Sequence, residues 1–282
     1  MIISRIIQLI NLELQPILSP DHAHRNHSIA SLPYRIGKIL FNNHRFKWKG
    51  NYVEFESRFG PILVHVHDQI VKELKQVIVP SKPFVVLDIG ANTGQFGIAL
   101  RNNFEDLEIH SFEPNNEPFE MLRRNASSSK FWHTYKYGIG HTNEIVDFYW
   151  VPGKSGQGSI YHENANDSLL FASEKNIEIT KIQLINSAEI LVNTGKRHFD
   201  LIKIDVEGAE AIVLEQIKGL SWNFILLEVS QNRIGSIQIH DILQILRTAT
   251  TNPSVVGKIG KDRDQTYDLI IENRTKTQGK IL

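Results

Sequence analysis

The stretch FVVLDIGANTGQFG, from Phe84 to Gly97, decides the fold of this chain. Its first half is a short apolar, β-branched run that ends in Asp88, and its second half is rich in glycine and then apolar at helical spacing. The pattern predicts a strand, a tight turn and a helix. Gly90 and Gly94 lack a Cβ, so they permit a positive φ and a close approach of backbone amides to a ligand. Asp88 ends the predicted strand and can accept hydrogen bonds from a cationic or hydroxyl-bearing ligand.

Two later segments repeat this pattern of a strand that ends in an acid. LEIHSFEPNNEPFEML (107–122) predicts a strand ending in Glu113, then a turn at Pro114 and a helix. An acid at this place after a Gly-rich turn suits the two hydroxyls of a ribose. HFDLIKIDVEGAEAIVLEQI (198–217) predicts another strand, which ends in Asp205. The sequence therefore predicts three acids at the carboxyl ends of three strands, where open α/β sheets bind their ligands.

These segments together resemble the FkbM family of S-adenosylmethionine-dependent methyltransferases. The resemblance is carried by LDIGANTGQFG (87–97), FEPN (112–115) with Leu122, Gly138-Ile139-Gly140, DLIKIDVEGAE (200–210) and LLEVS (226–230). It covers about residues 50–272. It implies an α/β fold with a Rossmann-like class I methyltransferase sheet, mostly parallel and seven-stranded with helices on both faces, preceded by an N-terminal helical and hairpin extension.

The resemblance also implies S-adenosylmethionine as cofactor and a role for each matching residue. The turn from Gly90 to Gly94 would cradle the amino-acid end of the cofactor, and Glu113 would hold the ribose hydroxyls. Gly138 to Gly140 would lie near the adenine, although a plain turn between strands explains that segment equally well. The cofactor-binding residues that we expect are Asp88, Gly90, Asn92, Thr93, Gly94, Glu113, Pro114, Gly138, Ile139 and Asp205.

Asp205 and Glu207 are the catalytic residues that we expect. In the implied fold Asp205 lies beside the sulfonium, so one of the two could act as general base while the other orients the acceptor. Alternatively, Glu207 and Glu210 only favour the positive end of the helix that they begin, worth about 0.3–1 kcal/mol each, and for Glu210 we prefer this interpretation. No metal ligand is assigned. A divalent cation held by Asp205, Glu207 and Glu228 is conceivable, but nothing in the spacing requires it.

The expected reaction is O-methylation of a hydroxyl on a sugar, a glycan or another small natural product, and the choice among these acceptors rests on family analogy. Two alternatives stay open. One is a catalytically inactive methyltransferase-like binding module. The other is a nicotinamide-dependent oxidoreductase, which is less favoured because GANTG replaces the GxGxxG pattern. A nucleic-acid methyltransferase is not expected, since the chain has a formal net charge of zero and no Asn-Pro-Pro-Tyr-type segment.

Composition allows a sizeable core, because 41% of the 282 residues are hydrophobic. The absence of cysteine excludes disulfides. Charge is uneven: residues 1–53 hold seven Lys or Arg against two Asp or Glu, a net +5, which leaves −5 for the rest. This basic arm could contact an anionic membrane surface as a peripheral protein does, although a solvated face packed on the acidic remainder is favoured. The first ten residues are too short for a transmembrane helix, which favours a cytoplasmic protein; no oligomeric state is indicated.

The expected domains are a basic helical extension (1–50), a methyltransferase domain (51–272) whose Rossmann-like core is 83–272, and a C-terminal tail (273–282). Alternating segments on either side of Phe59-Gly60-Pro61 predict a hairpin, followed by a helix from residue 68. Residues 152–168 form a long Gly/Ser/Asn-rich loop, typical of a lid or a substrate contact. Lys203 interrupts a central strand. We expect its side chain either to extend to an end of the strand or to pair with an acid such as Glu228, in a structural role.

Overall fold

The computed structural model of the chain describes residues 45–48, 51–55, 60–78, 83–152, 156, 158–166, 177–230, 234–260 and 266–274. Of the helical extension expected over residues 1–50, only 45–48 are described, and they form a strand. The rest of that extension and most of the expected tail lie outside the described residues. None of the helices in these ranges is long and apolar enough to cross a membrane.

The strands are β1 (Arg45–Trp48), β2 (Asn51–Glu54), β3 (Phe84–Ile89), β4 (Leu107–Phe112), β5 (Trp132–Tyr135), β6 (Gly138–Ile139), β7 (Glu144–Trp150), β8 (Glu178–Ile185), β9 (His198–Ile204), β10 (Ser221–Ser230), β11 (Pro253–Ile259) and β12 (Thr266–Asn273). The helices are α3 (Gly60–Val77), α4 (Gln95–Arg101), α5 (Asn116–Ala126), α6 (His162–Asn166), α7 (Ser187–Thr194), α8 (Glu210–Ile217) and α9 (Ile239–Leu246).

Seven strands form the main sheet, in the order β11-β12-β10-β9-β3-β4-β5. Strands β3, β4, β5, β9 and β10 are parallel, whereas β12 is antiparallel to β10 and β11 is antiparallel to β12. This order confirms the expected Rossmann-like class I methyltransferase sheet, which is mostly parallel and seven-stranded. Because β9, β3 and β4 are neighbours, the turns that follow them meet at one edge of the sheet.

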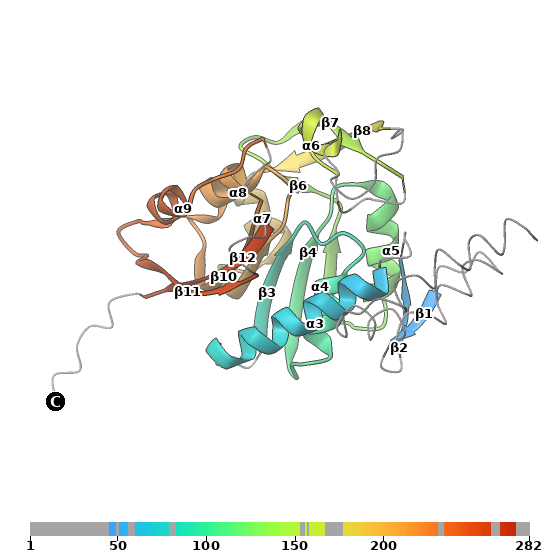
Figure 1. Cartoon of the computed structure of the whole chain (residues 1–282), viewed down its shortest axis with the longest axis horizontal. Coiled ribbons are helices and arrows are strands. Elements are labelled where there is room, and N and C mark those ends of the chain that lie inside the picture. Colours follow the sequence, from blue (N-terminus) through green and yellow to red (C-terminus); the bar gives the residue numbers. More distant parts are fainter. Residues whose placement is uncertain are drawn as a thin grey trace, which may run out of the picture.

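Helices cover both faces of this sheet, and α3 lies across β3 and β4 in Figure 1. On that face α3, α4 and α5 pack against side chains such as Val86 and Leu201. On the opposite face α7, α8 and α9 pack against side chains such as Leu87 and Ile202. Successive residues of a strand point to opposite faces, so a sheet buried on both sides needs continuous apolar runs, as FVVL and LIKI nearly supply.

The hairpin expected around Phe59-Gly60-Pro61 is wrong, because Gly60–Val77 is the helix α3. Buried residues of α3 recur at three- to four-residue spacing, at Val64, Asp68, Val71 and Leu74, and proline suits the first turn of a helix. The apparent alternation in PILVHVH was too short to tell a strand from a helix. An antiparallel pair does form just before it, between β1 and β2.

The β1–β2 pair is attached to the rest of the fold through Asn125 of α5. The side-chain oxygen of Asn125 accepts a hydrogen bond from Glu54 N at 2.7 Å, and its Nδ2 donates to Glu54 O at 2.9 Å and to Thr93 O at 2.8 Å. One buried amide thus joins β2 to the turn between β3 and α4, so residues 51–55 contact the Rossmann-like core directly.

A second, three-stranded sheet with the order β6-β8-β7 was not expected. It lies beyond the ends of β3 and β4 in Figure 1. The chain leaves the main sheet after β5, and Gly138 and Ile139 pair in parallel with Leu184 and Ile185. This small sheet places a wall over the carboxyl edge of the main sheet.

Helix α4 approaches β5 closely because Gly97 has no side chain. A Cβ at Gly97 would lie 2.2 Å from Cζ2 of Trp132. The indole is buried and its Nε1 donates a hydrogen bond to Ser111 Oγ at 3.0 Å, which fixes its position. The contact sets the spacing between the Gly-rich turn and the sheet.

We therefore expect Gly97→Ala to lower the free energy of unfolding by about 1–3 kcal/mol, the usual cost of overpacking a core, despite the higher helix propensity of alanine. Urea unfolding followed by circular dichroism measures this loss. Gly219→Ala is the matched control, because no heavy atom lies within 4 Å of a Cβ there, and it should change stability by less than about 0.5 kcal/mol. Equal stability of the two variants would contradict the packing described.

Candidate active site

A cavity of about 230 Å³ opens at the carboxyl ends of β3, β4 and β9, under the small sheet. Apolar side chains of both sheets and of α8, among them Phe112, Ile182 and Val213, form much of its lining. Eight of the residues expected at the site contribute to the wall: Gly90, Asn92, Glu113, Pro114, Gly138, Ile139, Asp205 and Glu207. The structure therefore brings together residues that are more than a hundred positions apart in the sequence.

The turn after β3 packs directly against the turn after β9. Gly90 has a φ of 78°, and a Cβ at this position would lie 1.8 Å from the backbone oxygen of Asp205. The amide of Asp205 donates to Ile89 O at 3.1 Å, and the amides of Gly90 and Ala91 both donate to Phe112 O at 3.0 Å. Only glycine combines this φ with such close contact, so the two turns meet backbone to backbone.

Glu113 is buried at the end of β4 and is held by backbone amides. Its Oε2 accepts from Asn92 N at 2.9 Å, and its Oε1 accepts from Asn115 N at 2.9 Å. Asn92 takes a φ of 51° to present its amide. An ionised carboxylate offers about four acceptor sites, more than these two amides use, and Glu113 lines the cavity.

Asp205 lines the cavity and also reaches a buried lysine below it. The Nζ of Lys203 is 2.8 Å from Asp205 Oδ2 and 3.9 Å from Asp88 Oδ1. Burial alone would raise the pKa of Asp205, but attraction to Lys203 and hydrogen bonds from Glu228 and Lys203 outweigh it and hold the pKa below its usual range. Asp205 is therefore an anion at neutral pH and a weak base.

The expected pairing of Lys203 with an acid is confirmed, and that acid is Asp205, with Asp88 at longer range, instead of Glu228. Lys203 thus lies beside Asp205 on the side away from the cavity, where a cation already balances that carboxylate. Among the described residues, Asp205, Glu207 and Glu228 do not gather as a metal-binding group.

Asn164 and Ser159 hold the turn that follows Asp205, and the sequence analysis missed both. Asn164 is buried; its Nδ2 donates to Glu207 O at 3.1 Å and to Ile234 O at 2.9 Å, while its Oδ1 accepts from Ile234 N at 2.9 Å. Ser159 Oγ also donates to Glu207 O, at 2.8 Å. Glu207 has a φ of 54°, which these bonds help to maintain. Nothing local marks these two polar residues within the long loop 152–168.

Glu210 serves the helix that it begins, in agreement with the preferred interpretation. Its Oε1 accepts a hydrogen bond from Gly208 N at 2.9 Å, and the side chain is buried. An amide before the first turn of α8 is thereby satisfied.

Asp88, Thr93 and Gly94 lie behind the cavity wall instead of lining it. Asp88 is fully buried and accepts a hydrogen bond from Ser111 Oγ at 3.1 Å; burial raises its pKa above the usual value, although Lys203 opposes the shift. Gly94 begins α4 with a φ of 90° and packs against Trp132. Any effect of these three on a bound ligand is exerted through the shape of the turn.

A row of ionisable groups continues from Lys203 on the α3 side of the sheet. Glu228 and Asp268 are paired across β10 and β12. Repulsion from Asp205, with burial, raises the pKa of Glu228 well above its usual value. Burial, followed by repulsion from Asp205, raises the pKa of Asp268 to about 7. Lys203 is thus shared by several carboxyl groups, of which some stay protonated near neutral pH.

A family model described as "Methyltransferase FkbM domain" matches residues 88–253, more than half of the chain. Among curated relatives, "Methyltransferase sdnD" of Sordaria araneosa is 25% identical over 168 residues, covering 52% of this chain and 64% of that protein. "31-O-demethyl-FK506 methyltransferase FkbM" of Streptomyces tacrolimicus is 22% identical over 183 residues, covering 58% and 70%. The chain therefore spans less than two thirds of the length of the Sordaria protein.

Among solved structures, the putative transferase PH0793 of Pyrococcus horikoshii gives a TM-score of 0.47 at 9% identity, covering 93% of this chain and 84% of that one. Fibrillarin of Aeropyrum pernix with bound S-adenosyl-L-methionine gives 0.44 at 11% identity, covering 83% of each. We assign the fold from the strand order of this chain and not from these two similarities.

We expect the charged row to make stability depend on pH. Folding raises the pKa of Asp268 to about 7. At a pH where this carboxyl is protonated in both the folded and the unfolded protein, the raised pKa does not change the free energy of unfolding. It destabilises the folded state increasingly as pH rises from about 4, where the unfolded side chain ionises, to about 7. Relative to Asp268→Asn, the wild-type protein should lose at least about 1 kcal/mol of unfolding free energy over this range. We do not expect a much larger value because partial exposure of Asp268 and attraction to Lys203 both weaken the effect.

Denaturant unfolding of both proteins between pH 4.5 and 8 measures the difference. Asp241→Asn, at an exposed side chain of α9, controls for the loss of one negative charge. A constant stability difference between wild type and Asp268→Asn at all pH values would contradict the raised pKa.

Proposed function

The chain belongs to the FkbM methyltransferase family, and on that premise we propose that it is an S-adenosylmethionine-dependent methyltransferase that O-methylates a hydroxyl of a small molecule. The observation that supports this most strongly is the buried carboxylate of Glu113, held by two backbone amides at the wall of the cavity. A carboxylate fixed in this way at the end of the second parallel strand is suited to ribose hydroxyls.

The residues around the cavity fit an adenosyl cofactor. The turn from Gly90 to Asn92 exposes backbone close to the cavity, and any side chain larger than hydrogen at Gly90 would collide with Asp205. Phe112, Tyr137 and Ile139 add an apolar and aromatic wall that suits a purine ring. We assign Glu113 to the ribose, the Gly90–Asn92 turn to the amino-acid end, and the wall with Ile139 to the adenine.

S-adenosylmethionine supplies a methyl group that its positively charged sulfur makes electrophilic. The protein then has to align an acceptor oxygen with that methyl and to remove one proton as the new bond forms. Asp205 is kept anionic by Lys203, so we assign it to stabilising positive charge and orienting the acceptor. Glu207 lines the same cavity and follows two residues later, and we assign it as the general base that accepts the hydroxyl proton.

The acceptor that we propose is a sugar, a glycan or another small natural product with a free hydroxyl. The name of the Streptomyces relative denotes an O-demethylated acceptor for that protein, which favours oxygen over nitrogen here. A cavity with a largely apolar lining favours a small acceptor over a nucleic-acid strand, which needs a basic surface.

The direct test is transfer of an isotopically labelled methyl group from S-adenosylmethionine to a panel of sugars, glycan fragments and small alcohols. We expect label in a hydroxyl position of at least one class, with S-adenosylhomocysteine formed in equal amount. Label found only on amines would contradict O-methylation, and cofactor binding without any transfer would favour an inactive binding module.

Glu113→Ala should weaken binding of S-adenosylmethionine at least about tenfold, because it removes charge-assisted hydrogen bonds worth about 1.5–3 kcal/mol each. Equilibrium dialysis measures the dissociation constant. Glu117→Ala, at an exposed position on α5, is the matched control and should bind as the wild type does. If Glu113→Ala is folded and binds with unchanged affinity, the ribose assignment is wrong.

Glu207→Gln should lower kcat about a hundredfold or more, the usual contribution of a general base, while cofactor affinity stays close to that of the wild type. Steady-state kinetics with the acceptor found above, together with dialysis, separate the two effects. Glu163→Gln, at an exposed side chain of α6, provides the control. Full turnover by Glu207→Gln would remove this residue from the chemistry.

A further inference from the structure

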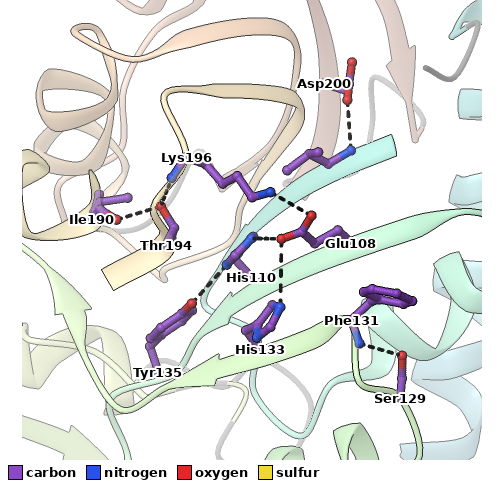
Figure 2. Close-up of polar contacts among 11 residues, drawn as sticks. Glu108, His110, Ser129, Phe131, His133, Tyr135, Ile190, Thr194, Lys196 and Asp200 are labelled. Atoms are coloured by element: carbon purple, nitrogen blue, oxygen red, sulfur yellow. Dashed lines mark hydrogen bonds and ion pairs between the residues drawn. The ribbon is translucent and has the colours of Figure 1, made fainter. Parts of the chain in front are cut away.

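Two histidines and a glutamate gather near the start of β4, away from the cavity. Glu108 and His110 are two residues apart on β4 and share one face, and the register of β4 and β5 places His133 opposite His110. The imidazole rings of His110 and His133 are stacked with centroids 4.9 Å apart. Figure 2 shows both rings directed at the same carboxylate oxygen of Glu108.

The separations between the ligand atoms match a small coordination shell. Nε2 of His110 is 3.1 Å from Glu108 Oε1, and Nε2 of His133 is 3.9 Å from the same oxygen. One ligand atom from each residue lies within 4.8 Å of the others. Ligands at 2.0–2.1 Å from a tetrahedral zinc ion are about 3.4 Å apart, and the two histidine-to-glutamate separations of 3.1 and 3.9 Å lie on either side of that spacing.

The second ring nitrogen of His110 has a partner of its own. Its Nδ1 lies 3.0 Å from the hydroxyl of Tyr135. In the tautomer with the ring proton on Nδ1, that proton is donated to the hydroxyl of Tyr135, and Nε2 presents its lone pair towards Glu108 and His133. A metal-bound histidine usually donates its other ring proton to an outer partner in this way.

The remaining groups leave one side of the cluster open. Lys196 Nζ bonds to the other carboxylate oxygen of Glu108, Oε2, at 2.8 Å, so Oε1 stays directed at the histidines. The side chain of His133 is 42% exposed, which gives an ion and a water ligand access from solvent. Lys196 also reduces the charge that Glu108 contributes, which favours imidazole-preferring ions over hard cations that need several carboxylates.

We propose that Glu108, His110 and His133 form a binding site for a zinc-type divalent cation, with water in the fourth position. Glu108 is the second residue of β4 and Glu113 follows the end of that strand, so Glu108 is roughly 16 Å from Glu113 along the strand at 3.3 Å per residue. The ion takes no part in methyl transfer. The ion would link β4 to the edge strand β5, which leads along the chain to Gly138 and the cavity wall.

The test is titration of the full-length, metal-free protein with Zn²⁺ at pH 7, followed by calorimetry, for wild type and for His133→Ala. His133 is partly exposed, so its replacement leaves the fold intact. We expect the wild type to bind one more equivalent of Zn²⁺ than His133→Ala, or to bind it at least tenfold more tightly, and to show a Zn²⁺-dependent rise in Tm that the variant lacks. Mg²⁺ should neither bind there nor compete.

His240→Ala is the matched control, because His240 is exposed on α9 and pairs only with Asp241 among the described residues; it should bind Zn²⁺ as the wild type does. Histidines elsewhere in the chain, including those at 22, 24 and 27, are present in all three proteins and cancel in the comparison. Glu108→Gln should reproduce the loss seen with His133→Ala. Equal stoichiometry and affinity for wild type and His133→Ala would overturn the proposal, whatever the activity of either protein.

Discussion

The contact on which the site depends is the backbone-to-backbone packing of Gly90 against Asp205. A Cβ at Gly90 would lie 1.8 Å from the oxygen of Asp205, and the Asp205 amide bonds to Ile89 O. Since the turns after β3 and β9 touch, the acids that follow β4 and β9 face the same cavity. Neither acid could be placed there by its own strand alone, because each position depends on how closely the neighbouring turns approach.

Asp205 connects two environments that the main sheet separates. Towards the cavity it presents a carboxylate, and on the α3 side it is bonded to the buried ammonium of Lys203. An isolated buried charge would be very costly, so the paired lysine allows the carboxylate to remain ionised beside an apolar cavity. Glu228 and Asp268, with raised pKa values, limit the net negative charge around that lysine by holding protons.

The sequence predicted the parts of the fold that local pattern controls, and the structure adds what depends on distant contacts. The strand-turn-helix at 84–101 and the acids at 113 and 205 follow from glycine placement and apolar runs, and the predicted seven-stranded sheet is confirmed. The prediction of a hairpin at 59–61 was wrong because a short alternation of apolar and polar residues also fits one face of a helix. The role of Asn164 and the grouping of His110 with His133 could not be predicted, since the first depends on the position of a long loop and the second on cross-strand register.

The most direct test of the proposed cofactor site is a crystal structure of the protein with S-adenosylhomocysteine. We predict that the adenosyl group occupies the cavity between the main and small sheets, with both ribose hydroxyls within hydrogen-bonding distance of Glu113 and the amino-acid end against the turn at Gly90. A ligand bound elsewhere on the protein, or in this cavity with its ribose away from Glu113, would contradict the assignment of the site.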